Sequence, residues 1–416
     1  PYVDGQLIPT STRDPTGGET ATMIVVGCGH AGASVACAAA DAGHGVLVLG
    51  RRSLDQSNPS FAQRVQEDPR LEFAVVDVHQ PPVRDADRPP WEQARWVVLA
   101  HEPRSFVADA DGVDAVIVRF QDLYDQLRRS GFESPHRMVV RIGSPPAEEP
   151  TSGTALPRSV YGGLKRRLRR LADDEARRGL RICTVAPAEI HSPWSGYGDE
   201  DPYRQILARL PLFALLHDVP TAAVSDRTFG QTVLAAAERG EPGAWYTCSD
   251  GVLGPGSAAA AMASELGQQP PTLVTWHGPA IQHLIEVLRG SEPTLDLARL
   301  AEHTTGMSPV WEAVDLGQQV GRGILRWSAW WAPPGLRDAW LDTLDQWSRT
   351  ALQLGVATLG EQVAPDLMEM LWAMGEDRRD DRLVQLSATE HAERLTDAVR
   401  RQARSLAGLG WLDADG

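Results

Sequence analysis

The stretch from residue 22 to residue 52 reads TMIVVGCGHAGASVACAAADAGHGVLVLGRR and decides the fold. Two apolar runs, 23–26 and 46–49, have the length and the composition of buried parallel strands. Between them, residues 33–42 are mostly alanine and predict a helix of small side chains. A strand, a helix and a second strand in such a short stretch predict a βαβ unit, and therefore a parallel sheet.

A Gly-x-Gly-x-x-Gly pattern joins the first run to the helix. In this position it indicates a dinucleotide-binding turn, because the three glycines permit a tight turn, close approach of backbone to a diphosphate, and close packing of helix on sheet. The helix N-terminus would face the phosphates with its partial positive charge. The alternative is a strand–helix turn without a ligand. We expect these turn residues to bind the cofactor: Gly27, Gly29, His30, Ala31 and Gly32.

Two arginines, Arg51 and Arg52, follow the second apolar run. An acidic residue at this point would bind the ribose hydroxyls of NAD, whereas paired guanidinium groups suit a 2′-phosphate. The sequence therefore favours NADP(H) as the cofactor. Two ordinary surface arginines are the alternative interpretation.

Further strand-like and helical segments alternate along the chain. The strand-like segments are 73–78, 96–100, 138–144 and 180–187, and the helical ones are 114–131 and 164–179. This alternation predicts an α/β fold with a Rossmann-type doubly wound parallel sheet. We expect a smaller substrate domain and a C-terminal helical extension. The predicted division is a flexible leader (1–20), a dinucleotide-binding domain (21–190), a substrate domain partly interleaved with the sheet (191–320) and the extension (321–416).

Tryptophans gather in the predicted extension, at Trp327, Trp330, Trp331, Trp340 and Trp347. So much aromatic surface predicts a folded helical addition rather than a solvated tail. Such a cluster is more often core or interface than the lining of a substrate pocket. A face for a homodimer and a lid over the active cleft both stay open.

A second motif places Tyr161 four residues before Lys165, so that both lie on one face of a helix. A phenol titrates near 10, and a neighbouring ammonium lowers that pKa. The pair can therefore exchange a proton with a carbonyl or alcohol oxygen. A hydroxyl at a strand end would hold that oxygen. Ser144 is the first candidate, and Ser152 and Ser159 remain open.

The order of these motifs resembles the short-chain dehydrogenase/reductase superfamily, and most closely its extended branch, over roughly residues 21–300. The resemblance rests on the glycine turn, VVDV (75–78), VVLAHEP (97–103), the Tyr-x-x-x-Lys motif and VAPAEIHSP (185–193). It implies that Tyr161 is the acid/base, that Lys165 lowers its pKa and anchors the ribose, and that Ser144 holds the oxygen. It also implies cofactor contacts at Asp77, Val78, Ala100, His101, Pro187, Ala188 and Ile190.

Three functions are compatible with these motifs. The first is NADPH-dependent reduction of a ketone, aldehyde or acyl thioester, as in the tailoring of secondary metabolites. The second is a nucleotide-sugar epimerase or dehydratase, although TVAPAEIHSPW (184–194) lacks the Arg before and the Asn after Pro187 that such enzymes show. The third is a non-catalytic dinucleotide sensor or scaffold, suggested by the glycine spacing and by residues 100–102.

Composition narrows the partners to small molecules. The formal net charge of −15 argues against nucleic acid and anionic membranes. The four cysteines form no CxxC pair, and the first twenty residues resemble no signal peptide, so we expect a cytoplasmic protein. We predict no metal site, because no second ligand stands at metal-binding spacing from His191, His217, His277, His283 or His303.

Overall fold

A computed structural model of the chain describes residues 22–80, 89–102, 110–143, 160–194, 221–253, 255–268 and 383–408. At a few of these positions, among them 160–163, the description is limited to the backbone. Four short strands are placed in addition and form two antiparallel pairs. These pairs are β1 (Tyr2–Val3) with β2 (Gln6–Leu7), within the predicted leader, and β13 (Thr275–Trp276) with β14 (Thr304–Thr305).

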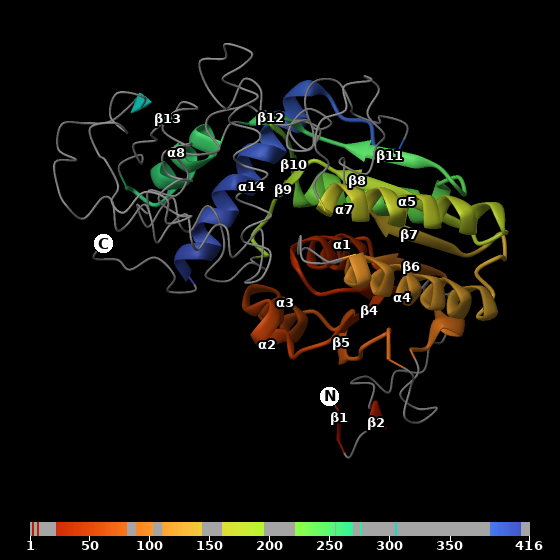
Figure 1. Cartoon of the computed structure of the whole chain (residues 1–416). Helices are drawn as coiled ribbons and strands as arrows, with labels where there is room; N and C mark the ends of the chain where they lie inside the picture. Colours follow the sequence, from red (N-terminus) through yellow and green to blue (C-terminus); the bar gives the residue numbers. More distant parts are fainter. Residues whose placement is uncertain are drawn as a thin grey trace, which may run out of the picture.

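A seven-stranded sheet organises the first part of the chain, in the order β11-β8-β7-β6-β3-β4-β5 (Figure 1). Every neighbouring pair in this sheet is parallel. The order reverses between β3 and β6, which is the topological switch point of a doubly wound sheet. The strands are β3 (Thr22–Val26), β4 (Gly45–Gly50), β5 (Leu71–Val75), β6 (Trp96–Leu99), β7 (Met138–Ile142), β8 (Ile182–Pro187) and β11 (Trp245–Cys248).

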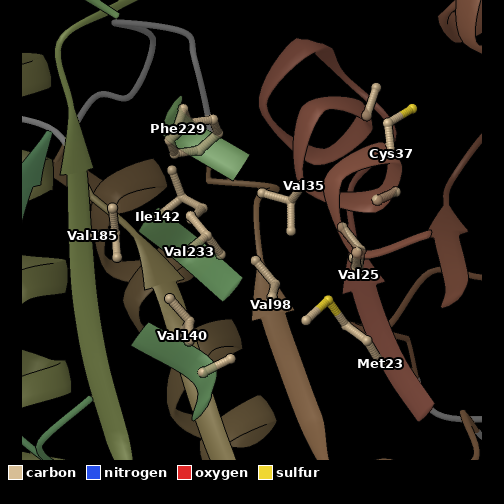
Figure 2. Packing of buried hydrophobic residues seen from close by; sticks show 14 of the residues in the cluster. Met23, Val25, Val35, Cys37, Val98, Val140, Ile142, Val185, Phe229 and Val233 are labelled. Carbon is tan, nitrogen blue, oxygen red and sulfur yellow. The ribbon is translucent and has the colours of Figure 1, made fainter. Parts of the chain in front are cut away.

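Helices cover both faces of this sheet, which explains why its strands are continuous apolar runs. Alternate residues of β3 serve the two faces: Met23 and Val25 pack toward α1 (His30–Asp41) and α7 (Asp226–Arg239), as Figure 2 shows. Ile24 and Val26 belong to the opposite core, under α4 (Ala110–Arg129) and α5 (Val160–Arg177). The short elements α2 (Leu54–Ser57), α3 (Pro59–Glu67) and η2 (Trp91–Gln93) lie between strands.

The alanine-rich sequence of α1 lets this helix lie very close to α7. A Cβ atom added to Gly230 of α7 would come within 2.5 Å of the Ala38 Cβ and 2.9 Å of the Ser34 carbonyl oxygen. Small residues on both helices are therefore a packing requirement, and they bring the later α7–β11 unit onto the same sheet as the glycine turn.

A second, smaller sheet follows, in the order β12-β10-β9. β9 (Glu189–His191) is parallel to β10 (Thr221–Ser225), and β12 (Gly251–Leu253) is antiparallel to it. The C-terminal helix α14 (Ala388–Gly408) packs on this sheet and on α8 (Pro255–Glu265), as Figure 1 shows. Residues 388–408 thus pack on the small sheet, whose strands are interleaved along the chain with β11 of the large sheet.

The predicted fold class is confirmed, with small differences in the bounds of the elements. The strand expected at 73–78 is β5 at 71–75: it starts two residues earlier and ends three residues earlier, where its ladder with β4 ends at the pair Gly50–Val75. All four cysteines are buried. The tryptophans of the predicted extension lie outside the described residues. Among the helices that are described, none has a stretch apolar and long enough to span a bilayer.

Candidate functional site

The glycine turn connects β3 to α1 at the switch point of the sheet. The Gly27 amide donates to the Leu49 carbonyl (2.8 Å), which ties the turn to β4. Gly27 has φ +106°, and a Cβ there would lie 2.7 Å from the carbonyl oxygen of Ala100. A Cβ on Gly32 would lie 1.9 Å from the Gly27 carbonyl oxygen. Both positions therefore require glycine, for backbone conformation at Gly27 and for close packing at Gly32.

Helix α1 begins without a side-chain cap. Gly29 is its N-cap residue, with extended backbone and no side-chain hydrogen bond, and the first turn holds no acidic residue. The first amides of a helix have no intrahelical acceptor and carry the positive end of the helix dipole. This helix end therefore fits the diphosphate of a dinucleotide, which would be held by the backbone of Gly29, Ala31 and Gly32.

Asn58 supports the glycine turn from a later segment of the chain, a role that the sequence did not reveal. Its side chain is fully buried, and its Nδ2 donates to the Cys28 carbonyl oxygen (3.0 Å). The Asn58 Oδ1 accepts the amide of Phe61 (3.2 Å) and so caps α3. One side chain thus holds both the glycine turn and the start of α3 in place. The sequence signal was the Asn-Pro pair at the start of a helix, which indicates a cap but does not reveal its contact with the turn.

The other predicted cofactor residues lie where neighbouring parallel strands end, at the same edge of the sheet as the turn. Arg51 and Arg52 follow β4 and are exposed. Asp77 follows β5, and its Oδ1 accepts the His79 amide (3.1 Å). Val78 is buried and follows β5, and Ala100 and His101 are half-buried and follow β6. The remaining predicted contacts are Pro187 at the end of β8, and Ala188 and Ile190 beyond it.

Lys165 lies in an ion cluster within this region. Its Nζ is 2.6 Å from Oε2 of Glu102, which follows β6, and the other oxygen of Glu102 accepts Nε of Arg141 from β7. The three side chains are 6%, 3% and 0% exposed in the order Lys165, Glu102, Arg141. Burial alone would raise the pKa of Glu102, but the two cationic partners outweigh burial and hold this pKa below its ordinary value.

Tyr161 is the second residue of α5, one helical turn before Lys165, so the helix predicted for the motif is present. Its side chain, and the whole of Ser144, Ser152 and Ser159, lie outside what the structure describes. The proposed roles of Tyr161 and of the serines therefore rest on the sequence. Of the five histidines weighed as metal ligands, His191 is described: it is buried, and its Nδ1 bonds to Gln402 Oε1 (3.0 Å).

Arg141 is the cluster member that the sequence analysis missed. It stands in the middle of the apolar strand MVVRI (138–142) and is fully buried. A charged residue inside a buried strand requires a charged or hydrogen-bonding partner, and that requirement was a readable signal. The sequence did not indicate which acid pairs with Arg141, because Glu102 lies at the end of a different strand.

No protein-family model and no curated protein sequence matches the chain. Several solved structures are similar to the chain. The crystal structure of gox2253 matches with a TM-score of 0.52 and 16% identity, and the match covers 95% of this chain and all of that one. At this identity the likeness shows the fold alone. It agrees with the Rossmann-type fold that the resemblance to short-chain dehydrogenases/reductases implied.

Two further structures are similar over a smaller part of the chain. PA4631, a nucleoside-diphosphate-sugar epimerase from Pseudomonas aeruginosa, matches with a TM-score of 0.46, 19% identity and coverage of 77% of this chain and 99% of that one. The dTDP-glucose 4,6-dehydratase of Bacillus anthracis in complex with NAD matches with a TM-score of 0.42, 12% identity and coverage of 60% and 82%.

Proposed function

We propose that this chain binds a nicotinamide dinucleotide across the carboxyl edge of the seven-stranded sheet and acts as an extended-type short-chain dehydrogenase/reductase. The observation that carries the proposal is the glycine turn at the switch point, with Gly27 at positive φ and an uncapped α1 behind it. This combination of turn, helix end and sheet position suits a diphosphate.

The cofactor proposed is NADP(H). Arg51 and Arg52 are exposed directly after β4, at the strand end next to the turn. A 2′-phosphate placed there would gain charge-assisted hydrogen bonds that an unphosphorylated ribose does not offer. No acidic residue stands at that strand end to prefer the ribose hydroxyls, since β4 ends at Gly50 and is followed directly by Arg51 and Arg52.

The reaction proposed is reduction of a small-molecule carbonyl, or the reverse oxidation of an alcohol. A bound nicotinamide supplies or accepts the hydride. Tyr161 would donate a proton to the carbonyl oxygen as the new C–H bond forms, and Ser144 would hold that oxygen by a hydrogen bond. Lys165, fixed by Glu102 one helical turn from Tyr161, would keep a positive charge beside the phenol.

Nucleotide-sugar epimerisation or dehydration is the second candidate. The observation that favours it is the small sheet β12-β10-β9, whose strands are interleaved along the chain with β11 of the large sheet. A second sheet of this kind suits the substrate domain expected of the extended branch. Such reactions return the hydride to the substrate, so that the dinucleotide is not consumed. This difference separates the two candidates experimentally.

Cofactor binding can be tested by titrating the full chain with NADPH and NADH in a calorimeter. We expect NADPH to bind at least about tenfold more tightly, roughly 1.4 kcal/mol, the scale of one charge-assisted contact. Replacing both arginines (Arg51→Ala with Arg52→Ala) should remove most of this preference. Arg95→Ala is the matched control, because Arg95 is exposed at the opposite edge of the sheet, just before β6. Equal affinities in all proteins would refute the choice of NADP(H).

Turnover distinguishes the reactions. Ketones, aldehydes and acyl thioesters should oxidise NADPH, which is followed by its absorbance, whereas nucleotide sugars should change without net cofactor oxidation. Mass spectrometry of the purified protein would identify a ligand that remains bound. Tight dinucleotide binding with no turnover on either panel would favour the non-catalytic sensor, and failure to bind any dinucleotide would overturn the proposal as a whole.

A further inference from the structure

Two histidines, His79 and His101, form a direct pair at the carboxyl edge of the sheet. Their Nε2 atoms lie 2.9 Å apart, and the ring of His101 is stacked on Phe120 of α4 with ring centroids 5.1 Å apart. His79 follows β5 and His101 follows β6. The Cβ of His101 lies 3.1 Å from where a Cβ on Gly27 would be, so the pair stands directly against the glycine turn.

The hydrogen bonds fix the protons of the neutral pair. Nδ1 of His79 lies 3.3 Å from the carbonyl oxygen of Arg119, and a carbonyl can only accept, so this nitrogen carries a proton. In neutral His79 the Nε2 is then an acceptor, and Nε2–H of His101 must donate to it. Neutral His101 therefore presents a bare lone pair at Nδ1. That atom is buried and has no hydrogen-bond partner within the described residues.

One added proton can be accommodated without breaking a hydrogen bond of this pair. If Nδ1 of His101 were protonated, it would be a donor, and the backbone of Val26 at the start of the glycine turn favours that protonated form. The two rings would keep their shared Nε2 hydrogen bond, and Nδ1–H of His79 would keep the Arg119 carbonyl as its acceptor. The pair can therefore carry one positive charge in its present geometry.

The charges around the free pair oppose that proton. Burial lowers the pKa of His101 to about 3, and the neighbouring charges of His79, Arg51 and Lys165 act in the same direction. Burial also lowers the pKa of His79. The Arg119 carbonyl and Asp77 favour its protonated form, whereas the charges of Arg119 and Arg51 disfavour it. Asp77 thus favours a charge on the pair, whereas Arg51, Arg119 and Lys165 oppose it. Glu102, next in sequence to His101, is already paired with Lys165 and Arg141. The phosphates of a dinucleotide would supply a counter-charge for the pair.

We propose that His79 and His101 are a proton-accepting pair of the dinucleotide site, which takes up one proton from solvent when a phosphate group of the ligand binds. The inference rests on the proposed function. It adds that affinity for the dinucleotide is linked to pH through these two residues, and it assigns both of them to the phosphate-binding surface. The phosphate is either the diphosphate at the glycine turn or the 2′-phosphate beside Arg51.

Calorimetry of the full chain tests the pair. NADPH is titrated at pH 6.5 in buffers of different ionisation enthalpy, and the slope of observed heat against that enthalpy gives the protons taken up. We expect uptake approaching about one proton, and affinity that rises by up to about tenfold per pH unit as the pH falls. NADH in place of NADPH separates the sources: uptake with both ligands assigns the diphosphate, and uptake with NADPH alone assigns the 2′-phosphate.

His79→Gln and His101→Gln should each reduce the uptake to less than half. His136→Gln is the matched control, because His136 is exposed in the loop before β7, at the opposite edge of the sheet, and should leave uptake unchanged. His79 is partly exposed, so His79→Gln keeps the test decisive even where His101→Gln fails to fold. Binding without proton uptake, or the same uptake in all variants, overturns the pair and leaves the dinucleotide site standing. Absence of any binding heat overturns the site itself.

Discussion

Lys165 and Glu102 form a buried ion pair that joins helix α5 to the end of strand β6, with Nζ and Oε2 2.6 Å apart. Arg141 of β7 bonds to the second carboxylate oxygen, so one acid pairs with two bases in a nearly solvent-free position. The lysine of the Tyr-x-x-x-Lys motif is therefore held in place by a residue that a simple reading of the motif does not include. Glu102 becomes the first target for mutation.

Glu102→Gln should lower the free energy of unfolding by about 3–5 kcal/mol, because it leaves two buried bases without their acid. Denaturant titration of wild type and variant measures this loss. Asp114→Asn is the control: Asp114 pairs with Arg167 of α5 at 2.6 Å, but these side chains are 64% and 45% exposed. We expect less than about 1 kcal/mol for the control. Similar losses in both variants would contradict a special role for the buried pair.

The same carboxylate predicts a pH dependence of stability. The pKa of Glu102 in the folded chain lies below its ordinary value of 4.5, because Arg141 and Lys165 outweigh the effect of burial. A lowered pKa stabilises the fold above the unfolded-state value, and this contribution is lost as the pH falls through the folded-state value. The stability difference between wild type and Glu102→Gln should therefore be full at pH 6 and should narrow below pH 4.5. A constant difference down to pH 3 would contradict this.

Gly32→Ala should disrupt the turn, because the added Cβ would lie 1.9 Å from the Gly27 carbonyl oxygen and the backbone would have to move. We expect a loss of stability of about 1–3 kcal/mol and at least about tenfold weaker dinucleotide binding. Gly45→Ala, at the start of β4, is the matched control, since a Cβ there meets no atom within 4 Å. Thermal unfolding and calorimetry of the two variants decide, and a Gly32→Ala variant that binds like wild type would remove the turn from the site.

The docking of α14 depends on a buried pair. Nδ1 of His391 lies 2.5 Å from Oδ1 of Asp250, and Oδ2 of Asp250 accepts the Ser225 amide at 2.7 Å. Asp250→Asn can keep only one of these acceptors, so we expect a loss of about 1.5–3 kcal/mol and faster tryptic cleavage within α14. Asp397→Asn, on the exposed side of α14, should cost less than about 1 kcal/mol. Equal cleavage rates for the two variants would show that the buried pair does not hold the helix.

The sequence predicted the features that depend on neighbours along the chain. The two apolar runs, the glycines between them and the alanine helix act over a few residues each, and the βαβ unit with Gly27 at positive φ is present. The i to i+4 relation of Tyr161 and Lys165 is equally local, and α5 contains both residues. The spacing of residues along the chain was therefore enough to predict the fold class and the helix that carries Tyr161 and Lys165.

Contacts between distant segments were not predictable in this way. Glu102 reaches Lys165 across 63 positions, and Asn58 reaches Cys28 across 30. An arginine inside a buried strand indicates that it has an acidic or hydrogen-bonding partner, but several acids along the chain could have been that partner. The sequence predicted that the segment of α14 is helical. The pairing of α14 with Asp250 and its packing on the small sheet depend on how the chain folds back, which neighbours along the chain do not indicate.

The chemistry proposed for Tyr161 can be tested against a second tyrosine of the same domain. Tyr161→Phe removes the proton donor while keeping the ring, so the fold and NADPH binding should persist. Turnover should fall by roughly a hundredfold or more, the usual scale for a positioned general acid. The assay is the rate on whichever carbonyl compound the wild-type protein reduces, together with NADPH affinity.

Tyr124→Phe is the matched control. The Tyr124 hydroxyl is buried in the core under α4 and has no hydrogen-bond partner in the part of the chain that the structure describes, and burial raises its pKa above the ordinary value. A phenol in that setting exchanges no proton with a substrate, and removing it should leave turnover unchanged and stability equal or slightly higher. Lys165→Ala should weaken NADPH binding as well as turnover, whereas Ser144→Ala should reduce turnover alone. If Tyr161→Phe turned over as fast as Tyr124→Phe, the Tyr-x-x-x-Lys motif would be an ordinary helix start, and the proton would have to come from another group.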